Sequence, residues 1–146
     1  MATEYRIFTE DDFEELRQMV TALYEEDSYG EPMSEEKVRR TVSEFRHHPD
    51  KGQIMLFCED KQVVGYAILI FFWSNEHGGD TVFIDEIYIR PQWRNRGISS
   101  NFILYLSSSP YKAIQVEVTP SNEKSLAFFL RQGFRADDNR YLWKVL

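Results

Sequence analysis

The most constraining feature of the sequence is a junction near its centre, where a β-rich run is followed by a basic turn and then by a helical pattern. Residues 81–89 are rich in apolar residues typical of a β-strand. From Gly97 onward, the apolar residues recur at the spacing of a helix. The free N–H groups of a first helical turn and the helix dipole together form an anion site. Arg94 and Arg96 add two positive charges. The junction predicts a strand, turn and helix suited to a pyrophosphate, although taken alone it also fits an ordinary solvated helix start.

Apolar periodicity and turn residues divide the rest of the chain into alternating helices and strands. The pattern predicts helices beginning near Thr9, Ser34, Gly97 and Asn122. It predicts strands over residues 5–8, 54–58, 63–73, 81–89 and 113–118, with two short strands near Phe134 and over 141–145. An antiparallel first half followed by strand-helix-strand units indicates an α/β fold, with one mixed, mostly antiparallel sheet of about seven strands and about four helices. We expect a single domain over residues 1–146.

Composition argues against several kinds of binding partner and against a disulfide or a metal site. The 24 acidic and 17 basic residues give a formal charge of −7, which disfavours nucleic acid and anionic membranes as partners. Cys58 is the only cysteine, so no intrachain disulfide can form. No leader or membrane-spanning run is evident, and we expect a cytoplasmic protein. The three histidines lack metal-ligand spacing, so we expect no metal.

Two separated motifs resemble those of GNAT N-acetyltransferases. Arg94-Asn95-Arg96-Gly97-Ile98-Ser99 is similar to the family's coenzyme A motif, although Ser99 stands where the family has glycine or alanine. The segment from Asn122 to Gly133-Phe134 is similar to the family's asparagine-led helix that ends in glycine-phenylalanine. Both motifs stand in the family's order, so the resemblance covers nearly the whole chain. It implies the acyl-coenzyme A N-acyltransferase fold.

The resemblance also implies acetyl-coenzyme A (acetyl-CoA) as cofactor. The backbone near Ile87 and Ile89 would bind the pantetheine arm as an added strand does, and Asn122 would hold that arm, its alternative role being a plain helix N-cap. The expected cofactor-binding residues are Ile87, Tyr88, Ile89, Arg94, Asn95, Arg96, Gly97, Ile98, Ser99, Ser100, Asn122, Phe128 and Phe129.

Acetyl transfer to an amine needs a base, because an alkylammonium with a pKa of about 10.4 is mostly protonated at neutral pH. Glu86 is the first candidate and Asp85 the competitor, because a β-bulge could exchange which one reaches the cleft. Either carboxylate could instead pair with a neighbouring arginine. Phe129 stands where many family members have a proton-donating tyrosine, and Tyr88 and Tyr141 are conceivable substitutes.

The acceptor is expected to contact two acidic and aromatic loops, over residues 24–33 and 73–80. These loops supply the candidate substrate-binding residues Tyr24, Glu25, Glu26, Tyr29, Trp73 and Glu76. Carboxylates and aromatic faces suit a cationic amine. We therefore expect a small-molecule amine acceptor, the alternatives being a protein or peptide amino group and a non-catalytic acyl-CoA-binding module. A homodimer formed through terminal strands is an expectation from the resemblance.

Overall fold

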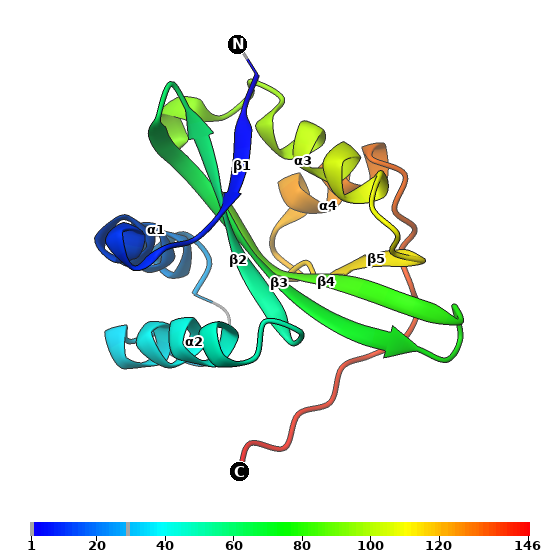
Figure 1. The fold of residues 1–146 in the computed structure, drawn as a ribbon. Helices are drawn as coiled ribbons and strands as arrows, with labels where there is room; N and C mark the ends of the chain where they lie inside the picture. Colours follow the sequence, from blue (N-terminus) through cyan, green and yellow to red (C-terminus); the bar gives the residue numbers. More distant parts are fainter. Residues whose placement is uncertain (1, 29) are drawn as a thin grey trace.

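The computed structural model describes residues 2–28 and 30–146, which form one mixed sheet with two helices on each face (Figure 1). The elements are β1 (Glu4–Ile7), the 3-10 helix η1 (Glu10–Asp12), α1 (Phe13–Glu26), α2 (Glu35–His47), β2 (Gly52–Glu59), β3 (Gln62–Ser74), β4 (Gly79–Ile89), the 3-10 helix η2 (Pro91–Trp93), α3 (Ile98–Ser107), β5 (Ala113–Val116) and α4 (Glu123–Arg131). Four elements precede the long strands β2, β3 and β4, and the helix α4 is the last regular element of the chain.

The strands lie in the order β1-β2-β3-β4-β5, so every strand neighbours the next in sequence. The first three pairs are antiparallel and β4 with β5 is parallel, which confirms the predicted mixed, mostly antiparallel sheet. The parallel pair requires a crossover, and η2 and α3 supply it. The strand-turn-helix junction predicted from sequence is therefore this crossover.

The sheet has five strands among the described residues, so the expectation of about seven was wrong in number. The two missing strands are those predicted near Phe134 and over residues 141–145, where the backbone has no regular secondary structure. A strand needs a partner for its backbone groups, and alternating apolar residues alone do not provide one. The C-terminal segment instead passes β5, where Tyr141 accepts a hydrogen bond from the Gln115 side chain, and then runs away from the sheet (Figure 1).

Two apolar cores lie on opposite faces of the sheet. Leu16, Met19 and Val20 of α1 pack with Val38 and Val42 of α2 on one face. Ile98, Phe102, Ile103 and Leu106 of α3, with Phe129 of α4, pack on the other. Leu16, Met19 and Val20 recur at steps of one, three and four residues, so they form one apolar face of α1, and this face is buried against the sheet.

The start of α1 is fixed by a partly buried ion pair. Asp12 accepts two hydrogen bonds from Arg6 of β1, each 2.8 Å long, and a third from the Thr9 backbone at 2.9 Å. These bonds lower the pKa of Asp12 from 3.8 to about 2, against the opposing effect of burial. The arrangement joins the first strand to the first helix. No helix in the described part of the chain is long and apolar enough to cross a bilayer.

Candidate active site

A bulge in β4 determines where the two candidate carboxylates point. Ile84 pairs with Leu69 and Glu86 with Ile68, so Asp85 is an extra residue without a partner on β3. Ile84 and Ile87 pack into the core under α3, while Asp85 and Glu86 both line a cavity under α2. An extra residue shifts the alternation of side chains along a strand. The bulge thus brings both carboxylates to the same face.

Glu86 is held by two phenols. Tyr24 of α1 donates to its Oε2 and Tyr66 of β3 donates to its Oε1, each at 2.7 Å. Burial raises the pKa of Glu86, the two hydrogen bonds lower it, and the neighbouring charge of Asp85 raises it again, with a raised pKa as the result. Glu86 is therefore a positioned carboxylate with a basicity above that of an ordinary glutamate. It makes no ion pair with the arginines that follow β4.

Asp85 is the more accessible of the two carboxylates. Its side chain reaches solvent, yet the surrounding cavity wall partly desolvates it and raises its pKa. Glu117, just past β5, has a pKa raised first by desolvation and then by the charge of Asp85. Glu117 could not be found from sequence, because only the pairing of β5 with β4 brings it near Asp85.

A large cavity, here called cavity A, opens where β4 and β5 part. Their pairing ends at Ile84 with Val116, so the edge of β4 beyond that point is free of β5. Cavity A has a volume of about 760 Å³. Its walls are the β4 edge, the beginning of α3, one side of α4 and the end of α1, and its lining includes Ile87, Tyr88, Ile89, Gly97, Asn122 and Phe129.

The first turn of α3 points unpaired amides at cavity A. Asn101 makes the helix's first backbone bond, to the Gly97 carbonyl at 2.9 Å, so the amides of the three residues between them have no acceptor within the helix. Asn95 and Gly97 have positive φ angles of 63° and 78°, which turn the chain sharply into the helix. No acidic residue occupies the first turn. Ile98, Ser99 and Ser100 all line the cavity.

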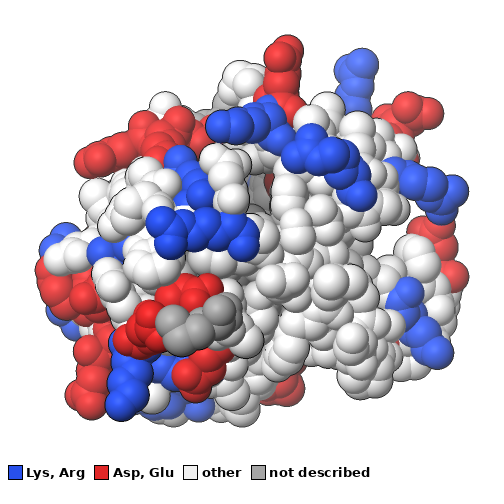
Figure 2. Space-filling view, turned by 90° about the horizontal axis from the view of Figure 1, so that it is seen from above, with Lys and Arg blue, Asp and Glu red and all other residues white. Residues whose placement is uncertain are grey.

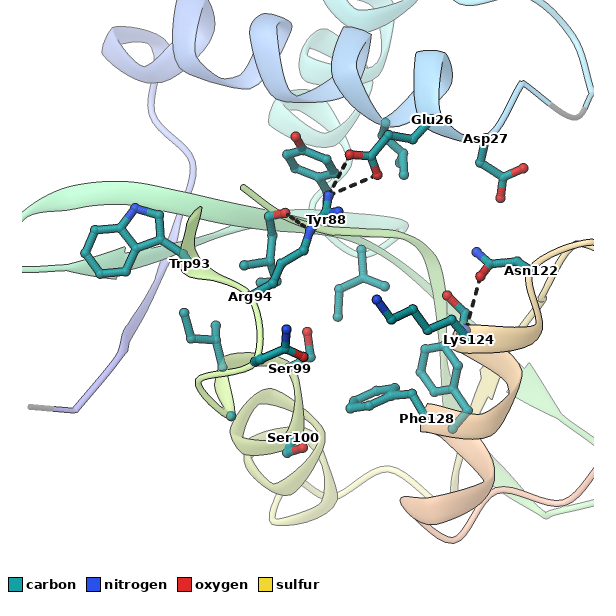
Figure 3. A pocket seen from close by; sticks show the side chains of 18 of the residues that line it. Glu26, Asp27, Tyr88, Trp93, Arg94, Ser99, Ser100, Asn122, Lys124 and Phe128 are labelled. Carbon is teal, nitrogen blue, oxygen red and sulfur yellow. Dashed lines mark hydrogen bonds and ion pairs between the residues drawn. The ribbon is translucent and has the colours of Figure 1, made fainter. Parts of the chain in front are cut away.

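The two arginines of the turn are placed differently. Arg94 lines cavity A, donates from Nε to the Ile89 carbonyl at 2.8 Å, and pairs with both carboxylate oxygens of Glu26 at 2.8 and 2.9 Å (Figure 3). Arg96 is not part of the lining, and its guanidinium lies over the Trp93 ring at 4.7 Å. Arg94 therefore joins the turn to the end of α1. Lys and Arg side chains surround a hollow on the face drawn in Figure 2.

The fourth helix forms the opposite wall. The side chain of Asn122 accepts from the Ser125 amide at 3.1 Å, so it caps α4 at the same time as it lines the cavity. Phe128 and Phe129 both line the cavity, and Phe129 is nearly buried. Lys124 points into the cavity from the side opposite Arg94 (Figure 3). Lys124 and Arg131 are lining residues that the sequence reasoning missed, because a charged helical residue usually faces solvent.

Two smaller cavities lie on the α1-α2 side of the sheet. Cavity B, of about 440 Å³, lies between α1 and α2, and its lining includes Tyr24, Glu25, Glu31, Met33 and Glu35. Cavity C, of about 380 Å³, lies under α2. Its lining includes Tyr24, Lys37, Arg40, Ile68, Asp85 and Glu86. Tyr24 is shared by both cavities.

Only some of the residues that the sequence predicted to bind the acceptor line these cavities. Tyr24 and Glu25 line cavity B, and Glu26 lines cavity A in its pair with Arg94. Trp73 and Glu76 are exposed near the tip of the β3-β4 hairpin and line none of the three cavities. Tyr29 lies outside the described residues.

Tyr141, the proposed alternative proton donor, is also distant from these cavities. Its exposed hydroxyl accepts a hydrogen bond from the Gln115 amide of β5 at 2.8 Å. Tyr88 is buried under Arg94, whose guanidinium lies 5.3 Å from its ring. Neither tyrosine is among the hydrogen-bond donors of Glu86.

Cavity A can accept a long ligand with an anionic centre. The free β4 edge can pair with an extended amide-containing arm, and the α3 amides can bind phosphate oxygens. Addition of a Cβ to Gly97 would meet only Asn101 Nδ2, at 4.0 Å, so the corner in front of this turn is open. The residues present therefore fit the pantetheine and diphosphate of coenzyme A.

Solved structures of other proteins have the same fold. A possible acetyltransferase from Clostridium difficile 630 is 18% identical and superposes with a TM-score of 0.83, over 100% of this chain and 99% of the other. The aminoglycoside N-acetyltransferase AAC(6')-Iy, solved in complex with CoA, is 16% identical with a TM-score of 0.77, over 99% of this chain and 95% of the other. The ribosomal-protein-alanine N-acetyltransferase of Brucella melitensis biovar Abortus 2308 is 14% identical with a TM-score of 0.77, over 99% of each chain.

At these identities the likeness shows a shared fold. The sequence itself matches the model of the acetyltransferase (GNAT) family over residues 13–134, which contain α1, the bulged strand, the α3 turn and α4. The resemblance seen in the two motifs is thereby confirmed, and the chain belongs to the acetyltransferase (GNAT) family.

Proposed function

We propose that this protein transfers the acetyl group of acetyl-CoA directly to a primary amine of a small, cationic acceptor. The observation that carries the proposal is the position of Glu86. It stands on the same strand as Ile87 and Ile89, whose free edge borders cavity A, and it lines cavity C on the other side of the sheet. A base and a cofactor groove thus meet at one strand.

Cavity A would hold the cofactor through backbone groups. The amides of Ile98, Ser99 and Ser100 would bind the diphosphate, and the β4 edge at Ile87 and Ile89 would bind the pantetheine arm. Arg94 would contribute positive charge from its place beside Glu26, and Asn122 would support the arm from the first turn of α4. Arg96 is stacked on Trp93, so it would contribute only through the long-range attraction between its charge and the diphosphate.

The chemical step requires a proton acceptor for the amine. Bound acetyl-CoA supplies a thioester carbonyl that a free amine can attack. Glu86 is our assignment for the base, because its raised pKa brings it closer to that of the amine than an ordinary carboxylate would be. Phe129 has no proton to give to the departing thiolate. Lys124, directed into cavity A, can stabilise that negative charge.

The charges around the acceptor cavities support a cationic amine. Cavity B is lined by Glu25, Glu31 and Glu35, and its one arginine, Arg17, is paired with Glu14. Glu86 and Glu117 have raised pKa values, first because burial desolvates them and then because the charge of Asp85 lies near each of them. A second cationic group on the acceptor would relieve this repulsion.

The test is release of coenzyme A thiol from acetyl-CoA across a panel of polyamines, amino acids, aminoglycosides and peptides. We expect the highest kcat/KM with di- and polyamines. Preference for peptides would favour a protein amino-group acetyltransferase. Tight binding of acetyl-CoA without turnover on any acceptor would indicate an acyl-CoA-binding module, and would contradict the proposal.

We also propose that two copies of the chain associate as a homodimer through the C-terminal segment. Leu142, Trp143, Val145 and Leu146 are all exposed and follow one another in a segment without regular structure. β5, to which Tyr141 is hydrogen-bonded, is an edge strand of the sheet. A second copy could cover these apolar side chains and complete the sheet edge.

A further inference from the structure

Among the groups around Glu86, Tyr24 has a position that substrate binding alone does not explain. It is half-buried, its hydroxyl donates to Glu86 Oε2 at 2.7 Å, and its side chain lines both cavity B and cavity C. Tyr66 donates to the other oxygen at the same distance, but it is fully buried and lines none of the three cavities. The two phenols therefore make equivalent hydrogen bonds to Glu86, but only Tyr24 can be reached from a cavity.

The path from the acceptor to Glu86 depends on which cavity holds the amine. Glu86 is not part of the lining of cavity B, where Tyr24 is. Glu86 lines cavity C together with Asp85, but Lys37 and Arg40 line that cavity too and offset the two carboxylates. Cavity B has three glutamates in its lining, and its one arginine is paired with Glu14. The acidic cavity B is therefore the better site for the ammonium group. Tyr24 lines cavity B and is hydrogen-bonded to Glu86, so it connects this cavity with the carboxylate.

We propose that Tyr24 is a catalytic residue that relays the proton of the acceptor ammonium to Glu86. The phenol oxygen accepts a proton from the ammonium nitrogen while its own proton passes along the existing hydrogen bond to Glu86 Oε2. The amine becomes the free base, Tyr24 is again a neutral phenol, and Glu86 becomes a carboxylic acid that later returns the proton to solvent. The amine's second proton ends on the thiol of coenzyme A, so the transfer is balanced.

The concerted character of the relay follows from the surroundings of Tyr24. Burial first, and then the charge and hydrogen bond of Glu86, raise the pKa of this phenol far above 10, so it does not persist as a phenolate. A relay needs only simultaneous transfer of two protons along bonds of ordinary length. The 2.7 Å bond to Glu86 is already formed before any acceptor is present.

This inference rests on the proposed acetyl transfer, and the paired variants Tyr24→Phe and Tyr66→Phe test it. Each variant removes one hydrogen bond to Glu86, so each raises the Glu86 pKa and moves the acid limb of the pH profile to higher pH. Above that limb, Tyr24→Phe should lower kcat about 100-fold, within the range of general acid-base effects. In the same pH range, Tyr66→Phe should lower kcat less than 10-fold. Equal losses in the two variants would overturn the relay.

A second measurement uses the wild-type protein, so it does not depend on whether the variants fold. With saturating diamine, kcat measured across mixtures of light and heavy water should curve downward if two protons move together, and a straight line would overturn the relay. Acetyl transfer that persists with Tyr24→Phe at the level of the wild type would remove the relay and leave the proposed function standing. A wild type without turnover would remove both.

Discussion

Glu86 shows at residue scale how a fold sets the strength of a base. Desolvation raises its pKa above 4.5, the phenols of Tyr24 and Tyr66 pull it down, and Asp85 pushes it up again. The active form of a base is the deprotonated one. The rate should therefore be highest above the raised pKa and fall as the pH drops through it.

Substitution of Glu86 by glutamine tests this assignment. Glu86→Gln should reduce kcat about 100-fold or more, because proton transfer is lost, and should abolish the acid limb of the pH profile. Binding of acetyl-CoA, measured by calorimetry, should change little, since Glu86 does not line cavity A. Asp85→Asn is the matched control, which should mainly raise KM for a diamine. The reverse pattern, a lost acid limb in Asp85→Asn only, would make Asp85 the base.

Gly97 is the residue on which the geometry of the α3 turn depends. With a φ of 78° it occupies a conformation that other residues adopt only with strain. Gly97→Glu should abolish measurable binding of coenzyme A, because a carboxylate would project into the open corner and repel the diphosphate. Gly97→Ala, which adds strain without charge, should weaken binding far less. Unchanged affinity in Gly97→Glu would remove the phosphate site from this turn.

At the scale of elements, the junction of β1 with α1 is held by Asp12 and Arg6. The pKa of Asp12 is lowered to about 2, so this contribution to stability is complete above pH 3.8 and disappears as the pH falls from 3.8 through 2. Asp12→Asn should lower the free energy of unfolding in urea by about 2 kcal/mol at pH 7. The difference between the two proteins should shrink as the pH approaches 2. Glu14→Gln, at an exposed ion pair with Arg17, should change stability much less, and equal losses would contradict the assignment.

The elements also show what could be predicted from sequence and what could not. Helical spacing and caps such as Ser34 are local signals, and the helices follow them. The bulge at Asp85 depends on the pairing of β4 with β3, and the sequence left its two carboxylates undecided. The presence of Lys124 in cavity A likewise depends on how α4 packs. Residues 141–145 have strand-like alternation, but a strand also requires a partner that alternation does not reveal.

At the scale of the whole molecule, the exposed C-terminal segment predicts self-association. Light scattering coupled to gel filtration should give twice the mass of the chain, which is 17.4 kDa. A chain ending at Asn139 lacks the exposed residues 140–146 and should run as a monomer that still binds coenzyme A. A full-length monomer at micromolar concentration would contradict the dimer. Dimers formed equally by the shortened chain would place the interface elsewhere.

The groups proposed to bind the cofactor and those proposed to bind and deprotonate the acceptor lie on opposite faces of the sheet. The α3-α4 face carries cavity A and the amides of the α3 turn, while the α1-α2 face carries Glu86 with its phenols and the acidic cavity B (Figure 1). The strand β4 connects them, since Ile87 and Glu86 are neighbours that face opposite sides. Donor and acceptor would thus approach one strand from two directions.

A crystal structure of the chain grown with acetyl-CoA examines this arrangement most directly. The diphosphate should lie within hydrogen-bond distance of the amides of Ile98 and Ser99, and the pantetheine arm should run along Ile87 and Ile89 towards Glu86. A diphosphate bound elsewhere, or a corner before α3 left empty at saturating acetyl-CoA, would contradict the account.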